Sequence, residues 1–156
     1  MIKENIKIQQ VDEKNVDQAK NLIIKGLSEY FEPYDHNKNP DLDDILKSYG
    51  NDKSIFFVAI LKNKVIGTGA MVEEKNLGRI VRMYVDKEYR KTGVGSRILN
   101  ALEKIAKERK YDRTFLETTK TWSAARNFYF AKGYTLEYED EESSYFYKII
   151  SSGFIK

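Results

Sequence analysis

The chain has 156 residues, of which 41% are hydrophobic, so it is long enough for one globular domain with its own core and short for two. Its 27 lysines and arginines exceed its 24 aspartates and glutamates by three, an excess too small to indicate nucleic-acid binding. The absence of cysteine excludes disulfides, thiolate metal ligands and a catalytic thiol, and a single histidine argues against a zinc site.

Neither end of the chain nor its interior predicts a membrane segment. The first five residues lack the apolar core of a signal peptide. The longest apolar run, residues 55–61, is too short to cross a bilayer. We therefore expect a soluble, cytoplasmic protein that binds neither membranes nor nucleic acid.

The first half of the chain predicts both strands and helices. Alternating apolar residues predict a strand at residues 6–11, and an apolar stripe at helical spacing predicts a helix that starts near residue 15. The polar residues 32–39, which include the lone His36, are predicted as a surface loop. A second short helix follows at residues 41–50, where the helix dipole explains the acids of the first turn. Three strands are predicted after it, at residues 54–61, 65–72 and 79–85.

A basic turn with two glycines separates the last of these strands from an amphipathic helix at residues 94–109. It consists of Arg90, Lys91, Thr92, Gly93, Val94, Gly95 and Ser96. Two glycines one residue apart let the backbone pass close to a ligand, because neither carries a Cβ atom. The start of the helix offers unpaired N–H groups and the positive end of its dipole, which favour phosphate. We predict that the turn binds a pyrophosphate, with an ordinary helix-entry turn as the alternative.

Two familiar phosphate loops do not match this chain. A Walker loop requires a Gly-Lys-Ser/Thr string that the sequence lacks. A dinucleotide fingerprint requires three glycines at a strand-to-helix turn, whereas Gly67 and Gly69 are followed by Val72 at the third place and lie within a predicted strand.

The second half of the chain predicts a strand at residues 114–118 that would pair in parallel with the strand at residues 79–85 across the helix between them. A helix at residues 123–132 is predicted to end at Gly133, a common C-terminal cap residue. Two strands around an acidic turn close the chain, at residues 134–138 and 144–150.

Two signatures make the chain resemble the GNAT (GCN5-related N-acetyltransferase) superfamily. The first is Arg-x-x-Gly-x-Gly at residues 90–95, and the second is Ala-x-x-x-Tyr-x-x-x-Gly-aromatic at residues 125–134. The resemblance covers nearly the whole chain. It implies one α/β (α+β) domain over residues 1–156, with a mixed central sheet of about six or seven strands flanked by about four helices.

The resemblance also implies acetyl-CoA as co-substrate and no metal. It implies that the backbone of one strand pairs with the pantetheine arm, at Met83, Tyr84 and Val85. It assigns the pyrophosphate to the amides of Lys91, Thr92, Gly93, Val94, Gly95 and Ser96, with Arg90 beside them. One departure concerns the pantetheine contact, because Trp122 stands where many relatives have asparagine and Ser123 would have to replace it.

Tyr129 is the candidate acid by this resemblance, because a hydroxyl beside the sulfur can protonate the departing thiolate. Core packing is the alternative role for this tyrosine, which lies between two phenylalanines. The carboxylate that serves as base in some relatives is missing, since residues 77–79 read Leu-Gly-Arg. Glu117 is the candidate base by order along the chain. A merely solvent-facing role for Glu117, Glu29 as base, or a water chain remain alternatives.

The leading hypothesis is transfer of an acetyl group from acetyl-CoA to a primary amine of a small molecule or peptide. A non-catalytic acyl-CoA-binding sensor module is the alternative, which the missing carboxylate keeps open. An RNA-binding domain is disfavoured by the balanced charge. The terminal strands are compatible with a homodimer.

Overall fold

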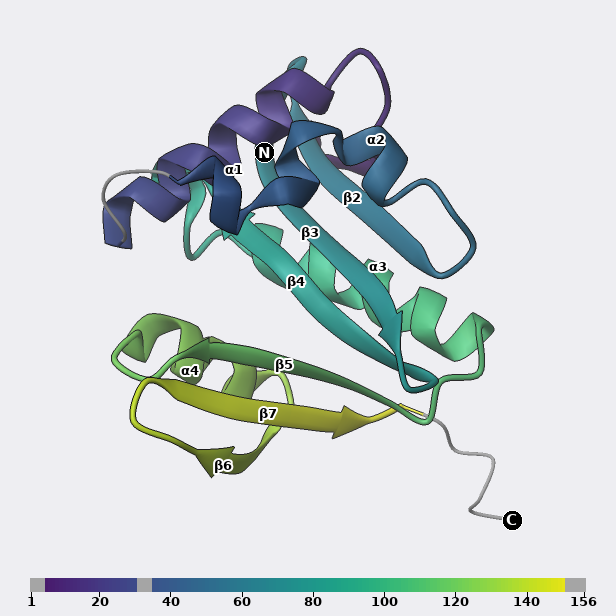
Figure 1. Ribbon diagram of the computed structural model, residues 1–156. Helices are drawn as coiled ribbons and strands as arrows, with labels where there is room; N and C mark the ends of the chain where they lie inside the picture. Colours follow the sequence, from purple (N-terminus) through teal and green to yellow (C-terminus); the bar gives the residue numbers. More distant parts are fainter. Residues whose placement is uncertain (1–4, 31–34, 151–156) are drawn as a thin grey trace. The chain divides into compact units, whose positions relative to one another are not determined.

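A computed structural model describes residues 5–30 and 35–150 of the chain. Seven strands form one sheet in the order β1-β2-β3-β4-β5-β7-β6 (Figure 1). The mixed α/β fold predicted from the sequence, with its four α-helices, is confirmed. The elements in chain order are β1 (Lys7–Gln10), α1 (Val16–Tyr30), η2 (His36–Lys38), η3 (Pro40–Asp43), α2 (Ile45–Ser48), β2 (Ser54–Leu61), β3 (Lys64–Glu74), β4 (Leu77–Val85), η4 (Lys87–Tyr89), α3 (Val94–Glu108), β5 (Arg113–Thr119), α4 (Ser123–Ala131), β6 (Thr135–Glu139) and β7 (Ser143–Ile149).

The pairing of the strands is mixed. β2 pairs in antiparallel fashion with β1 and with β3, and β7 does so with β5 and with β6. β4 and β5 are parallel, with Gly78 opposite Thr114 and Arg79 opposite Phe115. The parallel pair predicted across the long helix is therefore confirmed, as expected for a strand–helix–strand unit.

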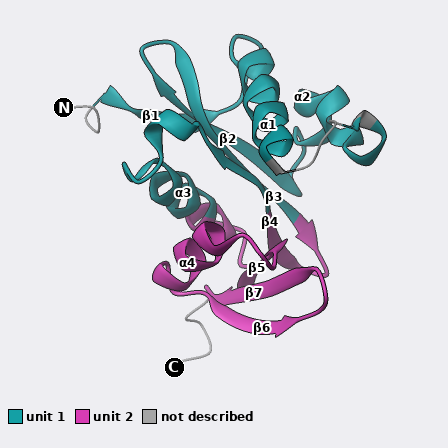
Figure 2. Ribbon diagram, turned by 90° about the vertical axis from the view of Figure 1, so that its left-hand side faces the viewer, with its two compact units in different colours: residues 1–72, 81–102 teal, residues 73–80, 103–156 magenta. Residues whose placement is uncertain are grey.

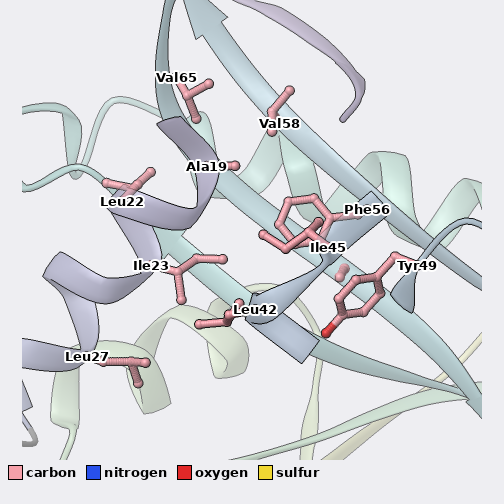
Figure 3. Close-up of a cluster of buried hydrophobic side chains, with 11 residues drawn as sticks. Ala19, Leu22, Ile23, Leu27, Leu42, Ile45, Tyr49, Phe56, Val58 and Val65 are labelled. Atoms are coloured by element: carbon pink, nitrogen blue, oxygen red, sulfur yellow. The ribbon is translucent and has the colours of Figure 1, made fainter. Parts of the chain in front are cut away.

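The chain divides into two compact units, one of residues 1–72 and 81–102 and one of residues 73–80 and 103–156 (Figure 2). In the first unit, α1 and α2 pack on one face of β2 and β3. Their apolar side chains form a core in which α1 contributes residues at helical spacing and β2 contributes every second residue (Figure 3). This core contains Ala19, Leu22, Ile23, Leu27, Leu42, Ile45, Tyr49, Phe56, Val58, Val65 and Ala70.

The start of α3 covers the other face of β3. A Cβ atom added to Gly67 would lie 2.8 Å from Val94 and 2.9 Å from Ile98, so this face of the strand is glycine-lined to let the helix approach. Val94 and Ile98 are both buried. The packing fixes where α3 begins, directly after the predicted pyrophosphate turn.

The single helix predicted at residues 41–50 is replaced by two shorter pieces, η3 and α2. Asp44 separates them with a non-helical backbone (φ −152°, ψ 82°), and its side chain accepts the Lys47 amide at 3.2 Å. Asp44 therefore caps the second piece instead of continuing the first. Of the predicted loop before it, residues 31–34 lie outside the described residues, and residues 36–38 form η2.

We expect Gly26→Ala to destabilise the protein. A Cβ atom at this buried position of α1 would lie 2.5 Å from Cδ1 of the Tyr84 ring on β4. The gain in helix propensity is about 1 kcal/mol, whereas overpacking costs about 1–3 kcal/mol. Urea denaturation should show a net loss of stability, with the exposed Lys25→Ala on the same helix as control. A stabilised Gly26→Ala protein would mean that the Tyr84 ring moves aside freely.

Candidate functional site

The predicted pyrophosphate turn lies between η4 and α3 and has a backbone suited to an anion. Lys91 and Gly93 adopt left-handed conformations, with φ of +66° and +91°. The carbonyl of Gly93 accepts the Arg97 amide at 3.1 Å, so α3 begins at the next residue. Left-handed residues next to a helix N-terminus turn successive N–H groups toward one concavity, which favours phosphate.

The two glycines of the turn differ in what they require. Gly93 has the left-handed backbone that glycine adopts without strain. Gly95 lies inside the first turn of α3 and has no positive φ, so its conformation does not demand glycine. Because glycine in a helix costs about 1 kcal/mol relative to alanine, Gly95 points to a need for close approach instead.

Asp86 and Thr92 hold the turn against the sheet. The Asp86 amide donates to the Ile66 carbonyl of β3 at 2.9 Å, and the Asp86 carboxylate accepts the Glu88 amide at 3.1 Å. The Thr92 hydroxyl donates to the Tyr89 carbonyl. These hydrogen bonds fix the backbone of the turn relative to β3.

Arg90 ties the turn to its surroundings. Its Nε donates to the Val85 carbonyl at 3.0 Å, and its two terminal nitrogens contact the Glu29 carboxylate at 2.8 and 3.2 Å. The charge of Arg90, which is predicted to lie beside the pyrophosphate, is paired with Glu29 in the structure. Lys91, the other cation of the turn, is also exposed. Glu29, the weaker candidate base, is engaged by Arg90.

An ion pair that the sequence did not reveal lies beside the predicted pantetheine strand. The Arg82 guanidinium on β4 contacts the Asp41 carboxylate of η3 through two hydrogen bonds of 2.6 and 2.9 Å, and the Tyr49 hydroxyl donates to the same carboxylate at 2.5 Å. Burial alone would raise the pKa of Asp41, but the bonds from Arg82 and Tyr49 outweigh it and hold the pKa below its usual value. Burial and Asp41 together raise the pKa of Tyr49.

In the second unit, Tyr129 lies on α4 with only 7% of its surface exposed. Its ring packs edge-on against the rings of Phe128 and Tyr134, with centroid distances of 5.0 and 5.6 Å. The centroid of the Phe146 ring on β7 lies 6.2 Å away. The packing role considered for Tyr129 is therefore present in the structure, and the acid role stays a prediction.

Tyr134 is held in turn by polar side chains. Its hydroxyl donates to Glu103 of α3 at 2.9 Å and lies 2.8 Å from the Thr114 hydroxyl, while the Lys148 ammonium contacts Glu103 at 3.1 Å. Burial, and then the charge of Glu103, raise the pKa of Tyr134, so this hydroxyl stays protonated. The ring next to Tyr129 is therefore anchored at its far end.

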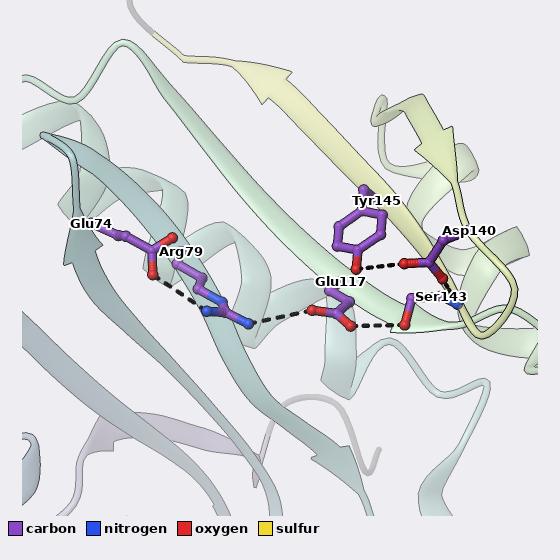
Figure 4. Close-up of polar contacts among 6 residues, drawn as sticks. All are labelled: Glu74, Arg79, Glu117, Asp140, Ser143 and Tyr145. Carbon is purple, nitrogen blue, oxygen red and sulfur yellow. Dashed lines mark hydrogen bonds and ion pairs between the residues drawn. The ribbon is translucent and has the colours of Figure 1, made fainter.

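Glu117, the candidate base, lies exposed on β5 (Figure 4). One carboxylate oxygen accepts the Ser143 hydroxyl at 2.7 Å, and the other lies 3.5 Å from the Arg79 guanidinium, which also contacts Glu74 at 3.3 Å. A pocket of about 280 Å³ opens here, and its polar lining consists of Arg79, the three carboxylates of Glu74, Glu117 and Glu137, and the rings of Tyr138 and Tyr145. Carboxylates and tyrosine rings of this kind suit a cationic group.

The acidic turn after β6 has its own structural role. Two backbone amides, those of Ser143 and Glu142, donate to the Asp140 carboxylate and lower its pKa. The hydrogen bond from Tyr145 to Asp140 raises the pKa of Tyr145 to about 12. Trp122 precedes α4 as its N-cap and is half-buried, with its carbonyl accepting the Arg126 amide at 3.1 Å.

The comparison with protein families decides the assignment. The sequence model of the Acetyltransferase (GNAT) family matches residues 21–134. The chain belongs to the GNAT acetyltransferase family. The match includes both signatures and indicates an acetyltransferase.

Solved structures share the fold over nearly the whole chain. A GNAT-family acetyltransferase from Staphylococcus aureus Mu50 is 23% identical, with 94% of this chain and 99% of that one covered and a TM-score of 0.83. An acetyltransferase from Streptococcus agalactiae 2603 is 20% identical over 94% and 99%, with a TM-score of 0.82. The PaiA N-acetyltransferase from Thermoplasma acidophilum, in complex with coenzyme A, is 18% identical over 92% and 98%, with a TM-score of 0.77. No curated protein sequence matches the chain.

Residues 5–30 and 35–150 contain neither a membrane-spanning helix nor a metal-binding cluster. No helix of this part is both long and apolar enough to cross a membrane. No group of three or more histidine, aspartate or glutamate side chains in the same part is placed to hold a metal ion.

Proposed function

We propose that this GNAT acetyltransferase transfers an acetyl group from acetyl-CoA directly to a primary amine of a small molecule or peptide. The observation that carries the proposal is the turn at residues 91–96, where two left-handed residues meet the N-terminus of α3. Its amides fit the pyrophosphate of coenzyme A, and Lys91 adds an exposed positive charge. Gly95 leaves room for the phosphate to approach.

In the proposed reaction, the lone pair of the amine nitrogen attacks the thioester carbonyl carbon and forms the new C–N bond. A backbone N–H of the Met83–Val85 stretch of β4 stabilises the negative charge that develops on the carbonyl oxygen. The C–S bond then breaks, and its electron pair leaves with the sulfur. Tyr129 donates its proton to the thiolate, and the proton that the nitrogen loses in forming the amide returns to the tyrosinate through water.

The proton on the acceptor must be removed at some point. An alkyl ammonium with a pKa near 10 is only about one part in a thousand neutral at pH 7, a deficit of roughly 4 kcal/mol. We assign its removal to Glu117, directly or through water, because this carboxylate is exposed and lines a pocket with two further glutamates. The lining carries three carboxylates against the one guanidinium of Arg79, and this excess of negative charge supports a cationic acceptor.

Thermal unfolding with different ligands tests the proposal first. Acetyl-CoA at 100 times its dissociation constant should stabilise the protein by about 2.7 kcal/mol, because it binds the folded state alone. CoA should stabilise it as well, and ATP and NAD should not. Stabilisation by ATP or NAD instead would contradict the prediction that the turn binds the pyrophosphate of coenzyme A. A panel of primary amines, with thiol release as readout, then identifies the acceptor class.

A further inference from the structure

β4 contains a residue in the left-handed conformation. Arg82 has a φ of +57° and directly precedes the Met83–Val85 stretch. This conformation is strained for an L residue and is uncommon inside a strand. It persists only where the surrounding structure imposes it, and such residues gather at functional sites.

The side chain of Arg82 is held from outside the sheet. Asp41 of η3 engages it through both carboxylate oxygens, and Tyr49 fixes that carboxylate from a third direction. The side chains of Arg82 and Asp41 are only 14% and 24% exposed, so water competes little with this bidentate pair. The pair therefore restrains the guanidinium in both position and plane.

The backbone of Arg82 is held from within the sheet. The hydroxyl of Thr68 on β3, which is fully buried, donates to the Arg82 carbonyl at 2.8 Å. In a trans peptide the C=O and the following N–H point in opposite directions. Because the Arg82 carbonyl is turned to the Thr68 hydroxyl, the Met83 amide points away from it.

We propose that Asp41, Arg82 and Thr68 are positioning residues that aim the Met83 amide at the thioester carbonyl of acetyl-CoA. The inference rests on the proposed function and names the backbone donor of its first step. Without Asp41, Arg82 is free to relax to an extended backbone, which rotates the Arg82–Met83 peptide. The Met83 N–H then no longer points at the thioester carbonyl. The turn at residues 91–96 still binds the pyrophosphate.

Infrared spectroscopy can detect the hydrogen bond from the Met83 amide when the bound acetyl-CoA is labelled with ¹³C at the thioester carbonyl. The measurement does not require the acceptor amine to be known. A hydrogen bond to the carbonyl oxygen shifts the stretching band to lower frequency than in buffer. We expect this downshift in the wild-type protein and its loss in Asp41→Asn and in Thr68→Val. Affinity for CoA, which lacks the carbonyl, should stay within about threefold in both variants.

Two matched variants serve as controls. Asp43→Asn removes the same charge from an exposed position of η3, and Thr68→Ser restores the hydroxyl, so both should keep the downshift. If Asp41→Asn fails to fold, the Thr68 pair decides. An unchanged downshift in Thr68→Val overturns the inference, as does a wild-type protein that binds acetyl-CoA with no downshift. A wild-type protein that binds no acetyl-CoA overturns the proposed function itself.

Discussion

Replacing Gly95 with valine is expected to lower the affinity of the protein for CoA by about a hundredfold or more. Gly95 lies in the first turn of α3, where the pyrophosphate would contact the helix amides. A branched side chain there occupies the space that the phosphate needs. The helix itself has no reason to unfold, because Gly95 has no positive φ and valine forms helix at least as well as glycine.

Calorimetric titration with CoA, paired with thermal unfolding of the ligand-free protein, separates these two effects. Gly95→Ala should weaken binding less than Gly95→Val, since only one carbon is added. Asn100→Val introduces the same side chain at an exposed position of α3 and should bind CoA normally. Unchanged affinity in Gly95→Val would place the pyrophosphate elsewhere.

The order of elements could be predicted from the sequence because it depends on local spacing. Apolar residues at helical spacing in α1 and α3, and at alternate positions in β2, identify a buried face without knowledge of what covers it. The break within the predicted helix at residues 41–50 was less visible. It depends on the backbone of Asp44, whose capping bond to Lys47 competes with continued helix.

The polar contacts of the site depend on pairs distant in sequence. Arg90 and Glu29 are 61 positions apart, and Arg82 and Asp41 are 41 positions apart. The helix dipole was enough to explain an acidic residue at Asp41. The sequence therefore gave no reason to expect its ion pair with Arg82. The sequence of β4 contained one signal. Gly78, Ile80 and Arg82 are spaced by two, so strand alternation assigns Arg82 to the same face as the buried Gly78 and Ile80. A charged residue on a buried face indicates an ion pair, and Arg82 forms one from a left-handed backbone.

Tyr129→Phe is expected to lower turnover roughly tenfold to a thousandfold while affinity for acetyl-CoA is retained. Phenylalanine keeps the ring that contacts Phe128, Tyr134 and Phe146, so the variant removes the hydroxyl and little of the packing. The activation barrier should rise by about 1.4–4 kcal/mol. The free energy of unfolding should change by less than this rise.

The measurement is the rate of thiol release at saturating acetyl-CoA, with the amine that reacts fastest in the panel. Tyr147→Phe on β7 removes a hydroxyl from the same unit and should leave the rate unchanged. A poor leaving group depends most on the acid, so thioesters of thiols with a higher pKa should show the larger defect in Tyr129→Phe. Normal turnover in this variant would reduce Tyr129 to a packing residue and assign protonation of the thiolate to water.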